Sequence, residues 1–411
     1  MCLNKDQKEA PPMKITSTPD LFSHDRIDEK ALRRTAFNLR WATVEEGVIP
    51  LTAGEMDYPI CPEVADAVGR HIQQGYLGYC PPQGFESFRE AIAEDLCRKG
   101  IPASADKVLV IDGAASALKV ACRAILNPGD EALTFDPVDF LLPHCAELAG
   151  AKVHRCPVSP IGGAFDIQQL ESMITAKTKA LLVCNPHNPT GRVLRTEELH
   201  AMAQLAEKHD LVLISDEVWS EIILGDVPMT SLASLSSETA ARTVTISGFS
   251  KSDGLSGLRV GYLHSCNDHL FRKIAEESGI LDTSGGATAL SQVAAEAALT
   301  NGGKWRRAFV DHLRQVIPAT AQRLSALEGI QCPVPEGTFL LFPKIQLPNT
   351  EMETLAEMIL KEARVSVVPG AARWFGPGAQ GHLRLSVATS QEILNEALTR
   401  IEAVWDSIRA R

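Results

Sequence analysis

Residues 179–217 decide the fold, and they read KALLVCNPHNPTGRVLRTEELHAMAQLAEKHDLVLISDE. Two short apolar runs, KALLVC and LVLIS, stand near the ends of this stretch, and a longer segment lies between them. In the longer segment Leu199, Met202, Ala203 and Ala206 fall on one stripe at helical spacing. The stretch therefore predicts a strand, an amphipathic helix and a second strand, which together form one unit of a parallel sheet.

The same alternation covers most of the chain from about residue 107 onward. Seven segments read as strands: residues 107–113, 131–137, 152–158, 179–186, 211–217, 243–249 and 259–265. They predict an α/β fold, with a mostly parallel, doubly wound sheet and helices on both faces. Residues 291–327 then favour helices, and short strand candidates at 337–345, 364–370 and 382–387 precede a closing helix at 390–410. This later pattern predicts a smaller α+β domain.

We predict three parts from these patterns. A flexible arm covers residues 1–16, where charges and two prolines occur. The large domain covers residues 51–295, and the small domain combines residues 17–50 with residues 296–411.

Composition limits the classes of partner. The chain has 411 residues, of which 45% are hydrophobic and 22% charged, as in a globular protein large enough for two domains. The formal net charge of −11 disfavours nucleic acid and anionic membranes as partners. Ten cysteines are scattered singly, without metal-ligand spacing, which indicates reduced thiols and no metal site. No apolar run reaches membrane-spanning length, so we predict a cytoplasmic protein.

Polar residues follow three of the predicted strands. Asn185 and Asn188 come after the strand at 179, Asp216 after the strand at 211, and Ser250 and Lys251 after the strand at 243. Because ligands of open α/β sheets bind outside the carboxyl ends of the strands, we expect these side chains to meet at one rim. A solvated surface charge is the ordinary alternative for Lys251.

The segment DGAASAL, residues 112–118, follows the first strong strand. Gly113, Ala114 and Ala115 would open a helix whose free N–H groups and positive end attract a phosphate. A turn of this kind alone usually means only close packing. With the hydroxyl of Ser250 and the guanidinium of Arg259, the turn becomes a plausible phosphate site.

Five motifs occur in order: NPHNPTG at 185–191, SDEVW at 215–219, SGFSK at 247–251, GLRVGY at 257–262 and LRLSVATS at 383–390. Together they closely resemble the class I/II aminotransferases, the fold-type I enzymes that use pyridoxal 5′-phosphate (PLP). The resemblance extends from residue 49 to the C-terminus. It implies a large PLP-binding domain with a seven-stranded, mostly parallel sheet, and a smaller α+β domain.

The resemblance also implies roles for the cofactor-binding residues. Lys251 matches the lysine that forms a Schiff base with the cofactor aldehyde and then shuttles the α-proton of the substrate. Asp216 matches the acid that keeps the pyridine nitrogen protonated, although a helix N-cap is its ordinary alternative. Asn188 matches the asparagine that binds the ring hydroxyl, and Arg259 matches the arginine that binds the phosphate.

Four further residues are carried over from the family. Arg384 matches the arginine that grips the substrate α-carboxylate, with a surface ion pair as its alternative. Gly54 matches a mobile segment that closes over the amino acid. Tyr79 matches a tyrosine that reaches the phosphate of the neighbouring subunit, which implies a homodimer, unless Tyr79 only packs. Asn185 is expected to hold its loop or the substrate carboxylate.

Three positions depart from the family pattern. Gly248 stands where many relatives have Ser or Thr, so the phosphate contact there would depend on Ser250. Trp219 stands where many relatives have a tyrosine, and we place it among the substrate-binding residues, although its indole cannot accept a hydrogen bond as a phenol does. The aromatic residue expected over the cofactor ring is not evident in residues 135–145, where Phe140 is the candidate.

The motifs do not separate two reactions. Residues 24–59 and Trp219 resemble the cystathionine β-lyase-like C–S lyases, whereas GLRVGY and LRLSVATS resemble ordinary aminotransferases. We favour an aminotransferase of amino-acid metabolism that moves an amino group from an L-amino acid to a 2-oxo acid. The first alternative is a C–S β-lyase. The others are another PLP reaction, such as cyclisation or oxidation of a basic amino acid, and a ligand-binding regulator without catalysis.

Overall fold

The structure, a computed structural model, describes residues 21–35, 40–162, 165–283, 285–348 and 350–411. Its centre is a seven-stranded sheet in the order β2-β8-β7-β6-β5-β3-β4. The strands are β2 (Val108–Ile111), β3 (Glu131–Asp136), β4 (Lys152–Pro157), β5 (Thr178–Cys184), β6 (Val212–Asp216), β7 (Thr243–Gly248) and β8 (Gly261–His264). All seven were predicted. Only β8 runs antiparallel to its neighbours within this sheet, so the predicted mostly parallel sheet is confirmed.

Helices cover both faces of this sheet. The helices up to residue 283 are α1 (Glu29–Thr35), α2 (Pro62–Gln73), α3 (Glu86–Arg98), α4 (Ala114–Ile125), α5 (Leu141–Leu148), α6 (Ile167–Ser172), α7 (Thr196–Lys208), α8 (Ser237–Ala241), α9 (Asp268–Ser278) and α10 (Ile280–Thr283). Alternation along β5 shows the two faces. Leu181 and Val183 pack in the core cluster that contains the apolar stripe of α7, whereas Ala180 and Leu182 pack in the cluster that contains α4.

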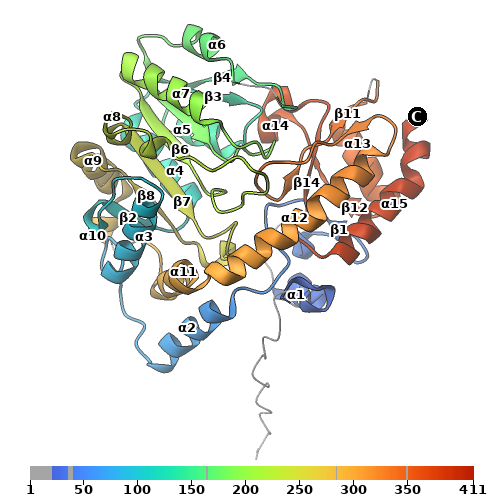
Figure 1. Cartoon of the computed structure of the whole chain (residues 1–411), viewed down its shortest axis with the longest axis horizontal. Helices are drawn as coiled ribbons and strands as arrows, with labels where there is room; N and C mark the ends of the chain where they lie inside the picture. The colour runs from blue at the N-terminus through green and yellow to red at the C-terminus, as the bar shows by residue number, and fades with distance from the viewer. Residues whose placement is uncertain (1–20, 36–39, 163–164, 284, 349) are drawn as a thin grey trace, which may run out of the picture.

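The chain then leaves the large sheet for a second group of elements. Its helices are α11 (Ala289–Asn301), α12 (Gly303–Ser325), α13 (Met352–Met358), α14 (Ala372–Phe375) and α15 (Gln391–Arg409). Its strands are β9 (Ile330–Gln331), β10 (Leu340–Leu341), β11 (Lys344–Ile345), β12 (Val365–Ser366), β13 (Val368–Pro369) and β14 (Leu383–Ser386). Figure 1 shows α12 as a long helix that reaches from α11 to this group, where it packs against α15.

The N-terminal part of the described chain joins these C-terminal elements. Strand β1 (Ile49–Pro50) pairs in parallel with β12, and Figure 1 shows the two beside α15. This pairing joins two segments that we assigned to the predicted small domain, residues 17–50 and residues 296–411. The exact division into domains stays a prediction, and the predicted arm, residues 1–16, lies outside the described residues. Within the described ranges, no helix is both long enough and apolar enough to cross a membrane.

The topology brings the ends of five strands to one rim. Strands β5, β6 and β7 are parallel neighbours, and Cys184 at the end of β5 lies opposite Asp216 at the end of β6. Strand β2 pairs antiparallel with β8, which pairs antiparallel with β7, so β2 ends at the same rim. Strand β3 pairs in parallel with β5 and ends there too. The loops that follow these strands therefore enclose a common space.

Candidate functional site

A cavity of about 710 Å³ lies at this rim. Its lining comes from the loop after β1, the loops that follow the strands of the large sheet, the start of α4, the helix α14, and the strands β13 and β14. Of the predicted site residues, the lining includes Gly54, Ala114, Ala115, Phe140, Asn188, Asp216, Trp219, Ser250, Lys251, Arg259 and Arg384. The structure thus brings together residues that are up to 330 positions apart in the chain.

Lys251 lies on the turn that follows β7, and it lines the cavity. Its Nζ donates a hydrogen bond to the carbonyl oxygen of Gly54 at 2.8 Å and lies 5.2 Å from the centre of the Trp219 ring. Burial lowers the pKa of this amine, and the charge of Arg384 lowers it further, while Asp139 opposes the shift. A lysine held in this way is closer to its nucleophilic, uncharged form than a surface lysine is.

Asp216 is the last residue of β6 and lines the cavity. Its Oδ1 accepts a hydrogen bond from the backbone N–H of Val218 at 3.2 Å. Burial raises the pKa of Asp216 to about 7, and the nearby carboxylate of Asp139 contributes to the increase. A buried acid of this kind is stabilised in its charged form when a cationic group binds beside it.

The beginning of α4 forms a cradle with Arg259. Gly113 precedes the helix at a φ of +106°, and a Cβ atom at this position would lie 3.0 Å from Nη2 of Arg259. Gly261 allows a second close approach, because a Cβ atom there would lie 2.8 Å from the backbone nitrogen of Ala114. The first turn of α4 and the guanidinium therefore approach each other closely, which makes this part of the cavity suited to a phosphate, and Ser250 lines the same cavity.

Arg384 lies on β14 and also lines the cavity. Its Nη1 donates to Oδ1 of Asn188 at 3.3 Å, and its Nη2 donates to the carbonyl oxygen of Thr52 at 3.3 Å. The guanidinium carbon lies 5.0 Å from the centre of the Phe375 ring. The buried Nε has no hydrogen-bond partner among the described residues. Such a guanidinium has donor capacity left for a carboxylate ligand.

The loop of residues 52–55 closes the cavity over Lys251. Gly54 leaves room for the amine, because a Cβ atom there would lie 3.2 Å from Nζ of Lys251 and 3.4 Å from the Trp219 ring. Trp219 itself is buried, with its ring 4.8 Å from that of Phe339. The indole therefore forms an apolar wall beside the lysine, and the expected contact of Trp219 with the substrate stays a prediction.

Asp139 is a cavity residue that the sequence did not reveal. It lies on the loop between β3 and α5, one position before the candidate Phe140. Its Oδ2 accepts a hydrogen bond from Nδ2 of Asn188 at 2.8 Å and lies 3.9 Å from Nη1 of Arg384. Phe140 also lines the cavity, and its ring packs edge-on against Trp374 at 5.7 Å. No periodic pattern marks a single acid in a loop, so only the tertiary structure identified it.

Three predicted residues do not line this cavity: Gly113, Asn185 and Tyr79. Gly113 directly precedes the lining residue Ala114. The amide of Asn185 is buried in its own loop, where Nδ2 donates to the carbonyl oxygen of Thr230 at 3.1 Å and Oδ1 accepts from Leu194 N at 3.0 Å. Of the two roles expected for Asn185, the structure therefore supports holding the loop and not binding the substrate. Tyr79 lies in the segment between α2 and α3 and is 96% exposed. Its expected role in a neighbouring subunit stays a prediction.

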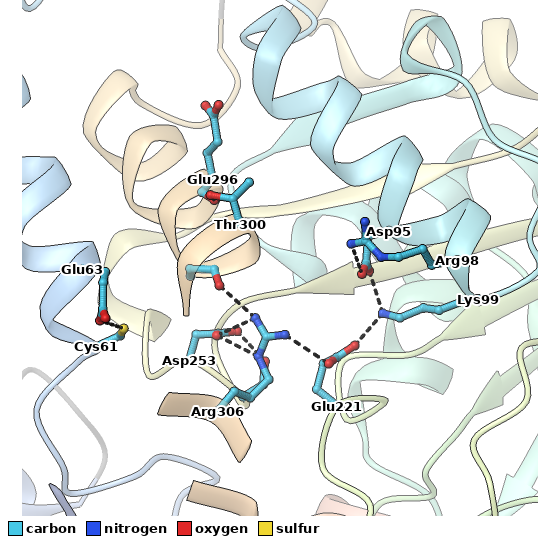
Figure 2. Close-up of polar contacts among 12 residues, drawn as sticks. Cys61, Glu63, Asp95, Arg98, Lys99, Glu221, Asp253, Glu296, Thr300 and Arg306 are labelled. Atoms are coloured by element: carbon cyan, nitrogen blue, oxygen red, sulfur yellow. Dashed lines mark hydrogen bonds and ion pairs between the residues drawn. The ribbon is translucent and has the colours of Figure 1, made fainter. Parts of the chain in front are cut away.

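A chain of ion pairs contacts the turn that carries Lys251 (Figure 2). Asp253, two residues after Lys251, lies 2.9 Å from Nη2 of Arg306 on α12. The same guanidinium lies 3.1 Å from Glu221, which lies 2.5 Å from Nζ of Lys99. Lys99 directly follows α3, and its Nζ also lies 2.8 Å from Asp95 on that helix. Burial raises the pKa of Asp253, although the charge of Arg306 opposes this shift. Because the network joins α3, α12 and the turn, it restrains the backbone that carries Lys251.

A second cavity, of about 720 Å³, lies between α1 and the start of α15. Its lining includes Glu29, Arg33, Glu396 and Arg400, and none of the predicted site residues. Residues 36–39, which follow α1 directly, lie outside the described residues. We place no site there.

The residues of the first cavity fit the cofactor that the motifs led us to expect. A phosphate would bind at the cradle of α4 and Arg259, an aldehyde would meet the amine of Lys251, and a ring nitrogen would meet the carboxylate of Asp216. The second N–H of the Asn188 amide is left for a ring hydroxyl, because the first donates to Asp139. The described residues of one chain therefore offer a group for each of these parts of the cofactor, and the contact expected from Tyr79 stays a prediction.

Comparisons with known proteins agree with this geometry. The family model described as aminotransferase class I and II matches residues 46–401. The putative aminotransferase YugH of Bacillus subtilis is 35% identical over 379 residues, which cover 88% of this chain and 92% of that protein. The aspartate aminotransferase of Thermotoga maritima is 36% identical over 369 residues, with 88% and 92% covered.

Solved structures show the same fold. A crystal structure of the Thermotoga maritima aspartate aminotransferase matches with a TM-score of 0.80 and 34% identity, covering 92% of this chain and 95% of that one. Cystalysin from Treponema denticola, whose structure contains pyridoxal 5′-phosphate, matches with a TM-score of 0.86 at 23% identity, covering 94% and 98%. This last likeness concerns the fold alone.

Proposed function

The chain belongs to the class I and II aminotransferases, and from this premise we propose how its own residues carry the reaction. The protein is a PLP-dependent enzyme that transfers the amino group of an amino acid to a 2-oxo acid. The observation that carries the residue assignment is the meeting of Lys251, Asp216, Arg384 and the α4 cradle in one cavity. Bound PLP supplies an electron sink that weakens the bonds to the α-carbon of the amino acid.

Lys251 is the residue that we propose holds the cofactor covalently and then moves the α-proton. Burial supports this role because it lowers the pKa of the amine. The hydrogen bond to the carbonyl of Gly54 and the Trp219 ring fix the direction of Nζ. The ion pair of Asp253 with Arg306 holds the turn that presents it.

Asp216 and the α4 cradle would bind the two ends of the cofactor. The carboxylate of Asp216 would stay charged beside a protonated ring nitrogen, because the pair removes the cost of burying the acid alone. Arg259, Ser250 and the N–H groups of Ala114 and Ala115 would bind the phosphate. These contacts would also orient the cofactor toward Lys251.

Arg384 would bind the α-carboxylate of the amino acid. Its contacts to Asn188 and the carbonyl oxygen of Thr52 hold the guanidinium plane, and its buried Nε points to donor capacity that a carboxylate would use. The stack on Phe375 fixes the opposite side. The loop that contains Gly54 would close over the bound amino acid.

We further propose a homodimer in which each subunit completes the site of the other. Tyr79 is 96% exposed and Tyr76 is 82% exposed, and both lie in the segment between α2 and α3. Two large aromatic side chains so exposed on one segment are typical of an interface. Tyr79 would reach the phosphate in the partner's cavity.

An intracellular location is also a proposal. The nine cysteines within the described residues form no disulfide, and most of them are buried. Unpaired buried thiols are typical of proteins in a reducing compartment.

Turnover by the purified, PLP-loaded protein tests the proposed function. We expect formation of a 2-oxo acid from an amino acid only when an acceptor 2-oxo acid is present. Lys251→Ala should abolish this turnover while the far-ultraviolet circular dichroism stays unchanged. Release of ammonia and pyruvate from cystathionine or cysteine without an acceptor would instead establish a C–S lyase. Retained turnover in Lys251→Ala would refute the assignment of the lysine.

A further inference from the structure

The Asp139 carboxylate lies within the substrate cavity and is held there firmly. Its backbone N–H donates to the carbonyl oxygen of Asn188 at 3.0 Å, and Phe140 N donates to the carbonyl oxygen of Trp374 at 2.9 Å. Its Oδ1 accepts from Leu141 N at 3.0 Å, and its Oδ2 accepts from Asn188 at 2.8 Å. Each oxygen therefore keeps acceptor capacity for a further donor.

The position of Asp139 relates it to the substrate and not only to the loop. Its Oδ2 lies 3.9 Å from Nη1 of Arg384, the residue proposed to bind the α-carboxylate. The loop that carries Asp139 is hydrogen-bonded to α14, and Trp374 and Arg373 of α14 also line the cavity. The carboxylate of Asp139 is therefore close to the place where Arg384 would hold an amino acid.

The remaining charged residues make the part of the cavity around Asp139 negative. Once Lys251, Arg259 and Asp216 are assigned to the cofactor and Arg384 to the α-carboxylate, the acids left over are Asp139 and Glu55. Oε1 of Glu55 accepts from the hydroxyl of Ser256 at 2.6 Å, whereas its buried Oε2 has no hydrogen-bond partner among the described residues.

The cation left over in the lining is Arg373. Its side chain is exposed, and its guanidinium carbon lies 5.4 Å from the centre of the Trp374 ring. Water and salt screen the charge of an exposed guanidinium. Arg373 therefore compensates the negative charges of Asp139 and Glu55 only weakly.

We propose that Asp139 is a specificity-determining residue that selects amino donors with a cationic side chain and disfavours dicarboxylic donors. An ammonium or guanidinium group would donate to the free acceptor sites of Asp139 and gain a charged hydrogen bond. A second carboxylate would meet a fixed like charge, and rejection of this kind is an effective source of specificity. The inference rests on the proposed function, because it assumes that Arg384 binds the α-carboxylate.

Substrate preference of the PLP-loaded enzyme tests the inference. The single-turnover absorbance change is measured with ornithine, lysine and arginine, with aspartate and glutamate, and with alanine as a neutral reference. We expect the single-turnover rate with ornithine to exceed the rate with aspartate by about 100-fold, when both rates are expressed relative to the rate with alanine. The fixed like charge would disfavour aspartate, whereas the charged hydrogen bond would favour ornithine. Asp139→Asn should reduce this ratio at least about tenfold, chiefly by favouring aspartate.

Binding without turnover separates this inference from the proposed function. The dissociation constants of α-methylornithine and α-methylaspartate, which have no α-proton to lose, are measured by absorbance titration of the holoenzyme. We expect tighter binding of α-methylornithine, and loss of that preference in Asp139→Asn. The exposed control Asp406→Asn on α15 should leave both constants unchanged.

Four outcomes are decisive. Equal or better binding of α-methylaspartate by the wild type would overturn the inference, and so would a preference that Asp139→Asn leaves unchanged. A general loss of reactivity in Asp139→Asn, equal for ornithine, aspartate and alanine, would assign Asp139 a structural role and also overturn it. A cationic preference in binding without turnover of any donor would instead overturn the proposed function and support the inference.

Discussion

At the residue scale, burial changes the ionisation of the two groups nearest the expected cofactor. The pKa of Lys251 is lowered by burial, and that of Asp216 is raised to about 7. The two shifts have opposite consequences for binding. An amine that loses its proton more easily can attack an aldehyde, whereas an acid that resists ionisation binds a cation more strongly once the cation is present.

Asp216→Asn should stabilise the protein without cofactor at pH 8. The folded carboxyl titrates near pH 7 and the unfolded one near 3.8. Folding therefore takes up a proton between these values, and the contribution of Asp216 to the free energy of unfolding falls as the pH rises through this window. The gain in melting temperature of the apo variant over the apo wild type should be largest above pH 7 and vanish toward pH 4.

The same substitution should weaken cofactor binding, because an amide cannot balance the charge of a protonated ring nitrogen. Fluorescence titration with PLP at pH 8 measures this loss. A stabilised apoprotein with unchanged PLP affinity would show that Asp216 does not face the ring nitrogen. A gain in melting temperature that does not depend on pH would contradict the titration argument.

At the element scale, the amino end of α4 and the turn after β7 create the two fixed points of the site. Helix α4 begins where Gly113 takes up a positive φ, and that conformation lets the guanidinium of Arg259 lie against the first turn. Arg259 itself has a positive φ of 51°, which is uncommon for a residue with a side chain. Two neighbouring unusual backbone conformations are typical of a functional position.

Gly113→Ala should reduce the affinity for PLP about tenfold or more, because the added methyl group would push Arg259 away from the phosphate position. Gly129→Ala is the matched control. Gly129 has a similar φ of +92°, but a Cβ atom there would meet nothing within 4 Å. Both variants should lose stability through the strained backbone, whereas only Gly113→Ala should raise the dissociation constant for PLP in a fluorescence titration. Equal affinities of the two variants would contradict a phosphate cradle at α4.

At the scale of the whole molecule, the site exists only because distant segments meet. Gly54 follows β1, Lys251 follows β7, and Arg384 lies on β14. The pairing of β1 with β12 holds the N-terminal segment against the C-terminal elements, and α12 connects these to the large sheet. Movement of one group of elements relative to the other would therefore change the distance between Arg384 and Lys251.

Hybrid dimers test the proposed contribution of Tyr79 across subunits. We expect Tyr79→Ala and Lys251→Ala homodimers to be impaired and inactive, respectively. A hybrid of one subunit of each kind has one site with both residues intact, so it should regain about half of the wild-type activity. Differently tagged, co-expressed subunits allow the hybrid to be purified and assayed. The exposed neighbour Tyr76→Ala serves as the control substitution and should keep full PLP affinity. A monomer in sedimentation, or a hybrid as weak as the Tyr79→Ala homodimer, would refute the shared site.

Much of the site could be predicted because the chemistry follows the strands. The seven strands of the large sheet have apolar runs of strand length, and the residues after β5, β6 and β7 meet because parallel neighbours end at one rim. No comparable rule predicts from the sequence in which direction a loop side chain points. Binding the substrate carboxylate was one of the two roles that we expected for Asn185, yet its amide is hydrogen-bonded within its own loop region. Asn188, three positions later, lines the cavity.

The amino-acid sequence by itself determined the order of strands and helices, the family, and the strand-end residues Asp216 and Lys251, because these depend on local patterns and ordered motifs. Only the tertiary structure decided which loop residues share the cavity, and it placed Asp139 between Asn188 and Arg384. The reason is physical. Periodicity reports which face of an element is buried, whereas the charge balance of a cavity depends on side chains from loops far apart in the chain, which come together only when the sheet forms.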